Sequence, residues 1–146
     1  MGRAETTPMT EMELADELRL VIGRLARRLR QHAVGGLTPS QRSVLATLNQ
    51  SGVLRMGDLA RIEDVSPPSI TGIIGRLEEK GMVTRIPDPD DARSTMVQIS
   101  DEATRLLEES RKARSTYLAT QLSSLDADER ARLETAVRIL DRMIDE

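Results

Sequence analysis

The apolar residues near the start of the chain repeat at helical spacing. They lie four, four, three and four residues apart, which puts them on one face of a helix and gives the heptad-like spacing of a helix that packs against another helix. Gly35 and Gly36 follow and are expected to end this helix. The stripe predicts an amphipathic helix within residues 10–36. Its members are Leu14, Leu18, Ile22, Leu25 and Leu29.

A second helix is predicted to begin at Thr38. The hydroxyl of Thr38 can cap the helix, Pro39 suits the first helical position, and Gln41 completes a capping box. Gly52 ends the pattern. The apolar face of this helix comprises Val44, Leu45 and Leu48.

Two more helices are predicted in close succession. The first covers residues 57–62, which is barely two turns. The second opens with Ser66 as its N-cap, and Gly81 is the expected C-cap. Because Pro68 disfavours the α conformation at Pro67, we expect Pro68 to be the first helical residue. The apolar face of the second helix comprises Ile70, Ile73, Ile74 and Leu77.

The period then changes from that of a helix to that of β-strands. Residues 82–86 and 95–99 are short β-like runs, and residues 87–94 between them are rich in turn formers. This pattern predicts a two-stranded hairpin with a long, exposed tip.

The last third of the chain predicts two further helices. Ser100 caps the first, which extends to about Leu122. Asp126, with Glu129 three residues later, caps the second. The second helix again has an apolar stripe, made of Leu133, Val137, Leu140 and Ile144.

The fold class that follows is mainly α with a small β-hairpin. A short helix, a tight turn, a second capped helix and a hairpin are the elements of a winged helix-turn-helix lobe, which we assign to residues 37–100. This lobe is too small to cover three long flanking helices, and exposed apolar stripes usually mark interfaces. We therefore expect residues 10–36 and 101–146 to be dimerisation helices. The alternative is that these stripes pack within one chain.

Composition excludes several classes of function. The chain has no cysteine and a single histidine, His32, which excludes disulfides and a zinc site of His and Cys ligands. There is no glycine-rich phosphate loop, and Asp88, Asp90 and Asp91 lack the spacing of a calcium loop. A catalytic triad would need His32, which has no evident Ser or Asp arrangement around it. We expect no enzyme activity, no metal and no cofactor.

Hydropathy and charge indicate where the protein is located and which partners it can bind. The first residues lack the apolar core of a signal peptide, and no apolar run approaches the roughly 18–20 residues of a membrane span. A cytoplasmic protein without membrane contact is the expectation. The net charge of −3 argues mildly against a nucleic-acid partner, and residues 37–100 hold seven basic and eight acidic side chains. A DNA-binding face must therefore come from the local placement of charges.

The segment Val65–Ser100, VSPPSITGIIGRLEEKGMVTRIPDPDDARSTMVQIS, resembles the MarR family (multiple antibiotic resistance regulators). The resemblance is carried by the capped helix, the R-L-E-x-K-G pattern at Arg76–Gly81 and the D-x-R pattern at Asp91–Arg93, which are specific in combination. It extends over about residues 14–144. It implies a transcriptional regulator that acts as a homodimer, with interlocked terminal helices and two winged lobes on a pseudo-palindromic site in duplex DNA.

The predicted DNA contacts come from the start of the recognition helix and from the wing. Small polar residues there let the backbone approach the bases of a major groove about 12 Å wide, and free amide groups between Ser66 and Gly72 suit phosphates. Arg76 lies one turn beyond Gly72. The resemblance implies that Arg93 enters the minor groove and that Asp91 supports the wing. The predicted DNA-binding residues are Ser66, Pro67, Pro68, Ser69, Thr71, Gly72, Arg76 and Arg93.

Two positions depart from the pattern of the family. Many relatives carry a basic residue where Gly72 stands, and many carry two successive arginines in the wing, where Ala92 precedes Arg93. Both differences predict a weaker electrostatic contribution to DNA binding than in those relatives.

The resemblance also implies an effector pocket where the dimerisation helices meet the winged lobe. Relatives often bind aromatic carboxylates there, so that Arg28, His32 and Arg42 are candidate residues for a small aromatic or anionic effector. A repressor controlled by such a ligand is the leading hypothesis. The alternative is a protein-interaction module, since winged helices also serve as docking lobes without binding DNA.

Overall fold

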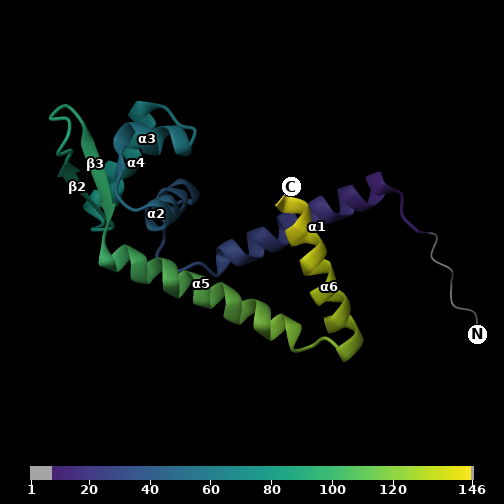
Figure 1. Cartoon of the computed structure of the whole chain (residues 1–146). Helices are drawn as coiled ribbons and strands as arrows, with labels where there is room; N and C mark the ends of the chain where they lie inside the picture. Colours follow the sequence, from purple (N-terminus) through teal and green to yellow (C-terminus); the bar gives the residue numbers. More distant parts are fainter. Residues whose placement is uncertain (1–7, 146) are drawn as a thin grey trace, which may run out of the picture. The chain divides into compact units, whose positions relative to one another are not determined.

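The computed structural model of the chain describes residues 8–145 (Figure 1). Residues 33–119 form one compact unit, and the segments 8–32 and 120–145 form another. The first unit contains the winged lobe. Its elements are α2 (Pro39–Ser51), β1 (Leu54–Arg55), α3 (Met56–Ile62), α4 (Pro67–Glu79), β2 (Val83–Pro87), β3 (Thr95–Ile99) and the greater part of α5 (Asp101–Leu122).

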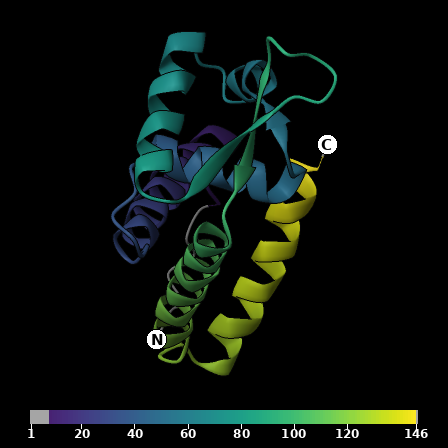
Figure 2. The same ribbon diagram turned by 90° about the vertical axis from the view of Figure 1, so that its left-hand side faces the viewer.

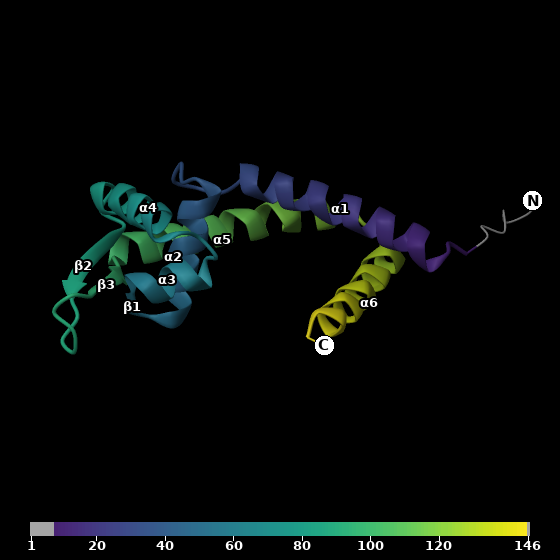
Figure 3. The ribbon, with the colours of Figure 1, turned by 90° about the horizontal axis from the view of Figure 1, so that it is seen from above.

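The three strands form an antiparallel sheet in the order β1-β3-β2. On the central strand, Val97 pairs with Leu54 on one side and with Arg85 on the other. The hairpin of β2 and β3 is as predicted, and its long connecting loop extends beyond the sheet (Figures 2 and 3). Strand β1 was not predicted, because two residues are too few to show a period.

The core of the lobe is made of aliphatic side chains from helices and strands alike. Burying each of these side chains contributes about 1.5–3 kcal/mol to folding. The core holds α4 against α2, α3 and the sheet, and thereby fixes which side of α4 faces outward. The largest fully buried side chains are Leu45, Leu48, Leu59, Ile70, Ile74, Leu77, Val44, Val83 and Val97.

The predicted capping box at the start of α2 is confirmed. The Thr38 hydroxyl accepts a hydrogen bond from the Gln41 amide (3.2 Å), and the Gln41 side chain accepts one from the Thr38 amide (3.1 Å). The helix ends at Gly52, as expected. These local signals therefore suffice to place α2 between the start of the lobe and β1.

Helix α4 begins at Pro67 and not at Pro68 as predicted. Ser66 is extended, with φ −67° and ψ 155°, and its hydroxyl accepts a hydrogen bond from the Ser69 amide at 3.3 Å. Proline has a fixed φ that suits a helix, and amide groups in the first turn have no partner within the helix. Two prolines are therefore tolerated there once Ser66 supplies the cap.

Gly35 and Gly36 lie in the loop before α2 and not at the end of a helix as predicted. Helix α1 (Glu11–Gln31) already ends at Gln31. Gly35 has φ +100°, and a Cβ atom there would lie 2.6 Å from the side chain of Leu106. Glycine is thus favoured by the backbone conformation, and any larger residue would also displace the end of the Leu106 side chain.

The second unit contains α1, the end of α5 and α6 (Ala127–Ile144). The predicted capping box of Asp126 and Glu129 is present at the start of α6. No residue of α1 or α6 is buried, and the apolar side chains of Leu14 and Val137 are 56% and 57% exposed. None of the helices within residues 8–145 is long and apolar enough to cross a membrane.

Candidate nucleic-acid interface

Helices α3 and α4 form the helix-turn-helix, joined by a turn of four residues. Asp64 in this turn has φ +53°, a left-handed conformation that aspartate tolerates. The Val65 amide donates a hydrogen bond to the Ala60 carbonyl at 3.0 Å, which closes the turn onto α3. As a result, α4 starts directly beside α3, with one side packed on the core.

The outward side of α4 carries the predicted contact residues. Ile70, Ile74 and Leu77 are buried in the core, and Ile73 is half-buried. All the predicted DNA-binding positions on this helix are exposed, so the structure brings them together on one surface. They are Ser66, Pro67, Pro68, Ser69, Thr71, Gly72 and Arg76.

The start of α4 offers fewer free amide groups than we expected for phosphates. Pro67 and Pro68 have no N–H group, the Ser69 amide donates to the Ser66 hydroxyl, and the Ile70 amide donates to the Ser66 carbonyl at 3.0 Å. The two prolines and the cap from Ser66 account for this difference. Contacts from this end of the helix must come from side chains, supported by the helix dipole.

The hydroxyl groups on this surface are partly engaged. The Thr71 hydroxyl donates a hydrogen bond to the Pro67 carbonyl at 2.9 Å. The Ser66 hydroxyl donates to the Ser69 hydroxyl, also at 2.9 Å. These bonds fix the orientation of each side chain before a partner binds.

A shallow groove of about 440 Å³ runs along the outward side of α4. It adds Ser40, from the first turn of α2, to the residues that the sequence predicted. No sequence signal marks Ser40 as a contact residue, because only the packing of α2 on α4 brings it there. The lining residues are Ser40, Val65, Pro68, Ser69, Gly72, Ile73 and Arg76.

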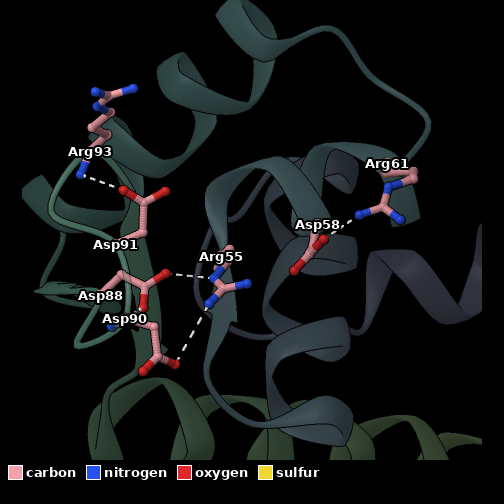
Figure 4. Close-up of polar contacts among 7 residues, drawn as sticks. All are labelled: Arg55, Asp58, Arg61, Asp88, Asp90, Asp91 and Arg93. Atoms are coloured by element: carbon pink, nitrogen blue, oxygen red, sulfur yellow. Dashed lines mark hydrogen bonds and ion pairs between the residues drawn. The ribbon is translucent and has the colours of Figure 1, made fainter.

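The wing loop, residues 88–94, joins β2 to β3 and carries Arg93 (Figure 4). The Arg93 amide donates a hydrogen bond to the Asp91 carboxylate at 2.9 Å, and the side chain of Arg93 is exposed. Within residues 8–145 its guanidinium forms no ion pair with an acidic group. The side chain is thus available to an external anion, and Asp91 holds the backbone next to it.

The first residue of the wing loop is a buried carboxylate, Asp88. Its Oδ2 accepts a hydrogen bond from Nε of Arg55 at 2.5 Å, and its Oδ1 accepts one from the Asp90 amide at 2.9 Å. The hydrogen bond from Arg55, followed by that from the Asp90 amide, holds the pKa of Asp88 below its usual value. Neither Arg55 nor Asp88 was among the predicted site residues.

The three candidate effector residues lie in different parts of the fold. Arg28 is on α1 and His32 is its C-cap, both in the unit of the terminal segments. Arg42 is on α2 in the other unit, where its guanidinium donates a hydrogen bond to the Leu37 carbonyl at 3.0 Å. Arg42 therefore already has a structural role at the start of the lobe.

Comparison with known proteins identifies the family. The MarR family model matches residues 37–95. The chain is 36% identical over 138 residues to an HTH-type transcriptional regulator of Mycobacterium bovis, covering 94% of this chain and 96% of that protein.

Solved structures agree with the sequence comparison. A transcriptional regulator from Pseudomonas aeruginosa PA01 is similar with a TM-score of 0.81 and 30% identity, covering 93% of this chain and 97% of that one. A MarR family protein from Bacillus stearothermophilus is similar with a TM-score of 0.74 and 26% identity, covering 95% and 100%. With a helix-turn-helix whose polar side faces outward and a wing that carries an exposed arginine, the chain belongs to the MarR family of DNA-binding transcriptional regulators.

Proposed function

We propose that the protein is a ligand-responsive repressor that binds a pseudo-palindromic operator as a homodimer. One observation carries the proposal: the exposed polar side of α4 and the exposed Arg93 of the wing belong to the same compact unit. In a winged helix-turn-helix the recognition helix enters the major groove. An arginine on a wing suits the adjacent minor groove, where a narrow width concentrates negative potential.

The contact residues divide into two roles. Ser69, Thr71 and Gly72 would lie against base edges, and Arg76 would reach a base or a phosphate from the next turn. Arg93 would enter the minor groove, with Asp91 supporting the loop. Ser66 and the two prolines that follow it would set where α4 begins, and hence how deeply it can enter the groove.

The homodimer is supported by the exposed stripes of the terminal unit. Several large apolar side chains of α1 and α6 are 40% or more exposed in the single chain, which suits an interface with a second copy. Two lobes related by a two-fold axis would read two half-sites about one helical turn apart, 10–10.5 bp centre to centre. The exposed stripes include Leu14, Ile22, Leu25, Leu133, Val137 and Ile144.

Two similar proteins support repression and ligand control. A transcriptional repressor of Bacillus subtilis, MdtR, is 33% identical over 94 residues. A MepR-like protein, whose structure is described as complexed with pseudoligands, is 30% identical with a TM-score of 0.54. Arg28, His32 and Arg42, which the family resemblance indicated, remain our candidates for binding an anionic or aromatic effector.

The deciding experiment is selection of bound duplexes from a random pool, followed by titration of the selected duplex at several salt concentrations. We expect an inverted repeat and an affinity that falls steeply with salt, because each phosphate contact releases counterions. Arg93→Ala should weaken binding by about 1–3 kcal/mol per lobe and relax preference at flanking A·T pairs. Retention of no duplex, or salt-insensitive retention, would favour a protein-docking module instead.

The sign of regulation needs a separate measurement. Transcription in vitro from a promoter that carries the selected site should fall when the protein is added, because a bound dimer competes with polymerase. Addition of salicylate, an aromatic carboxylate, should restore it. A rise in transcription on adding the protein alone would contradict the repressor role and leave the DNA-binding role intact.

A further inference from the structure

Arg55 links the short edge strand of the sheet to the wing loop. In the register of the sheet, Met96 pairs with Arg55 on one side and with Ile86 on the other, so the three are cross-strand neighbours. The guanidinium of Arg55 nevertheless bonds beyond these neighbours, to Asp88 just past the end of β2 (Figure 4). The contact therefore connects β1 and the start of α3 with the loop that carries Arg93.

Asp88 is the point where the wing loop is fixed to the lobe. Its side chain is only 1% exposed, whereas that of Arg55 is 46% exposed. A buried carboxylate is costly unless it is paired and hydrogen-bonded. Asp88 meets this condition with Nε of Arg55 and with the Asp90 amide. Removal of Arg55 would leave the carboxylate without its cation.

Hydrogen bonds within the loop connect Asp88 to the backbone at Arg93. The Asp88 amide donates to the Ser94 carbonyl at 3.4 Å, and the Ser94 amide donates to the Asp91 carbonyl at 3.0 Å. Asp91 in turn accepts from the Arg93 amide at 2.9 Å. A second nitrogen of Arg55 lies 3.9 Å from the Asp90 carboxylate. Both ends of the loop are thus tied to Asp88, and Asp88 is tied to Arg55.

We propose that Arg55 is a positioning residue for DNA binding, whose bond to Asp88 holds the wing loop so that Arg93 is presented to the minor groove. The proposal rests on the function proposed above. A loop that is ordered before binding loses less conformational freedom when the complex forms. Arg55 acts through the wing, because two of its nitrogens are already directed at the carboxylates of Asp88 and Asp90.

The test compares Arg55→Met with Arg61→Met. Arg61 forms an ion pair with Asp58 on α3 and has no bond to the wing (Figure 4), so that its replacement removes the same charge from the same lobe. Binding is measured to the selected duplex and to a copy whose flanking A·T pairs are replaced by G·C. Melting curves establish that each variant is folded at the temperature of the assay.

Arg55→Met should weaken binding to the A·T-flanked duplex by about 3- to 10-fold, since it restores the cost of ordering the wing. It should also bring the two duplexes closer in affinity. Arg55→Lys keeps the charge but cannot reproduce the guanidinium fork, so it should rescue only part of the loss. Arg61→Met should leave the ratio between the two duplexes unchanged.

The double variant Arg55→Met/Arg93→Ala decides between positioning and direct contact. If Arg55 acts through Arg93, its replacement should add less than about twofold once Arg93 is absent. A full additive loss would show that Arg55 contacts DNA itself and would overturn the proposal, as would an Arg55→Met variant that binds like the wild type. If Arg93→Ala alone changes neither the flank preference nor the salt dependence, the wing contact is wrong and the positioning role of Arg55 falls with it, whereas DNA binding itself fails only if the selection yields no duplex that binds in a salt-dependent way.

Discussion

Ser69 and Thr71 both carry hydroxyl groups on the outward side of α4, yet they present different chemistry to a partner. Thr71 donates its proton to the Pro67 carbonyl, which leaves its methyl group and its oxygen lone pairs for an external contact. The Ser69 oxygen accepts from Ser66, so its own proton can be donated. In the major groove, Ser69 suits the acceptors of guanine or adenine, and the methyl group of Thr71 suits the methyl group of thymine.

Two substitutions of Thr71 separate the roles of its methyl and hydroxyl groups. Thr71→Val keeps a methyl group in place and should retain a preference for thymine in the selected site. Thr71→Ala removes it and should reduce that preference by about 0.8 kcal/mol, the value of one buried methyl or methylene group. Competition binding with a thymine-to-uracil duplex, which lacks the base methyl, provides the measurement. Equal preferences in the two variants would contradict a methyl contact.

Gly72 offers a test that separates stability from binding. It lies inside α4, and a Cβ atom there would meet nothing within 4 Å. Gly72→Ala should therefore raise the free energy of unfolding by about 0.5–1 kcal/mol, because glycine is a poor helix former. Chemical denaturation measures this gain. The same substitution should weaken DNA binding, because the added methyl group thickens the surface that approaches the bases.

A matched control for Gly72→Ala is Gly57→Ala on α3. Gly57 also lies in a helix of the lobe, and a Cβ atom there would likewise meet no other atom within 4 Å. Its replacement should not alter the preference for bases in the selected site. If Gly72→Ala leaves DNA binding unchanged while it stabilises the fold, the helix does not approach the groove closely at this position.

At the scale of elements, the wing should respond to acid through Asp88. Its pKa is lower in the folded protein than in the unfolded chain, where a value near 3.9 is usual. The contribution of Asp88 to stability is thus present above about pH 4 and is lost as the pH falls through the lower, folded value. The difference in melting temperature between the wild type and Asp88→Asn should be constant near neutral pH and should shrink below pH 4.

Asp90→Asn is the control for this pH dependence, because it removes the same charge from a side chain that is 83% exposed. Its melting temperature should follow that of the wild type closely at neutral pH. A difference between the wild type and Asp88→Asn that stays constant down to pH 3 would show that the carboxylate of Asp88 does not stabilise the folded wing.

The sequence predicted the elements whose signals are local. The capping boxes of α2 and α6 and the apolar face of α4 depend on residues within one or two turns of each other. Strand β1 could not be found in this way, because Leu54 and Arg55 become a strand only by pairing with β3. The start of α4 was misplaced by one residue because the cap from Ser66 outweighs the restriction on a residue that precedes proline.

The candidate site was predictable to a similar extent. The outward residues of α4 follow from helical period and from the family pattern, and all of them are exposed as that pattern requires. The Arg55–Asp88 bond joins residues 33 positions apart, so that no spacing rule indicates it. The groove position of Ser40 and the engaged amides of α4 likewise depend on packing and on individual hydrogen bonds.

At the scale of the whole molecule, the loop before α2 is fixed to α5. The Ser110 hydroxyl accepts a hydrogen bond from the Val34 amide at 2.9 Å and donates one to the Val34 carbonyl at 3.1 Å. Ser110 is buried, and Leu106 on the same side of α5 contacts Gly35. The chain therefore enters the winged lobe at a point that α5 determines. In a dimer, this connection ties the position of each lobe to its α5.

Leu25→Asp on α1 should test the dimer without unfolding the winged lobe. Leu25 is 43% exposed in the single chain, so a carboxylate there costs little in a monomer, but it would be buried and unpaired in an interface between two copies. Sedimentation at micromolar concentration should give about twice the chain mass of 16.2 kDa for the wild type and about the chain mass itself for the variant. Arg27→Asp, which puts the same side chain on the polar face of α1, should remain dimeric.

Because two linked lobes gain about 10²–10⁴ in affinity over one, the monomeric variant should bind the full inverted repeat no better than a single half-site. A Leu25→Asp protein that stays dimeric, or a wild type that sediments as a monomer and still binds the full repeat tightly, would show that the stripe on α1 is not the interface.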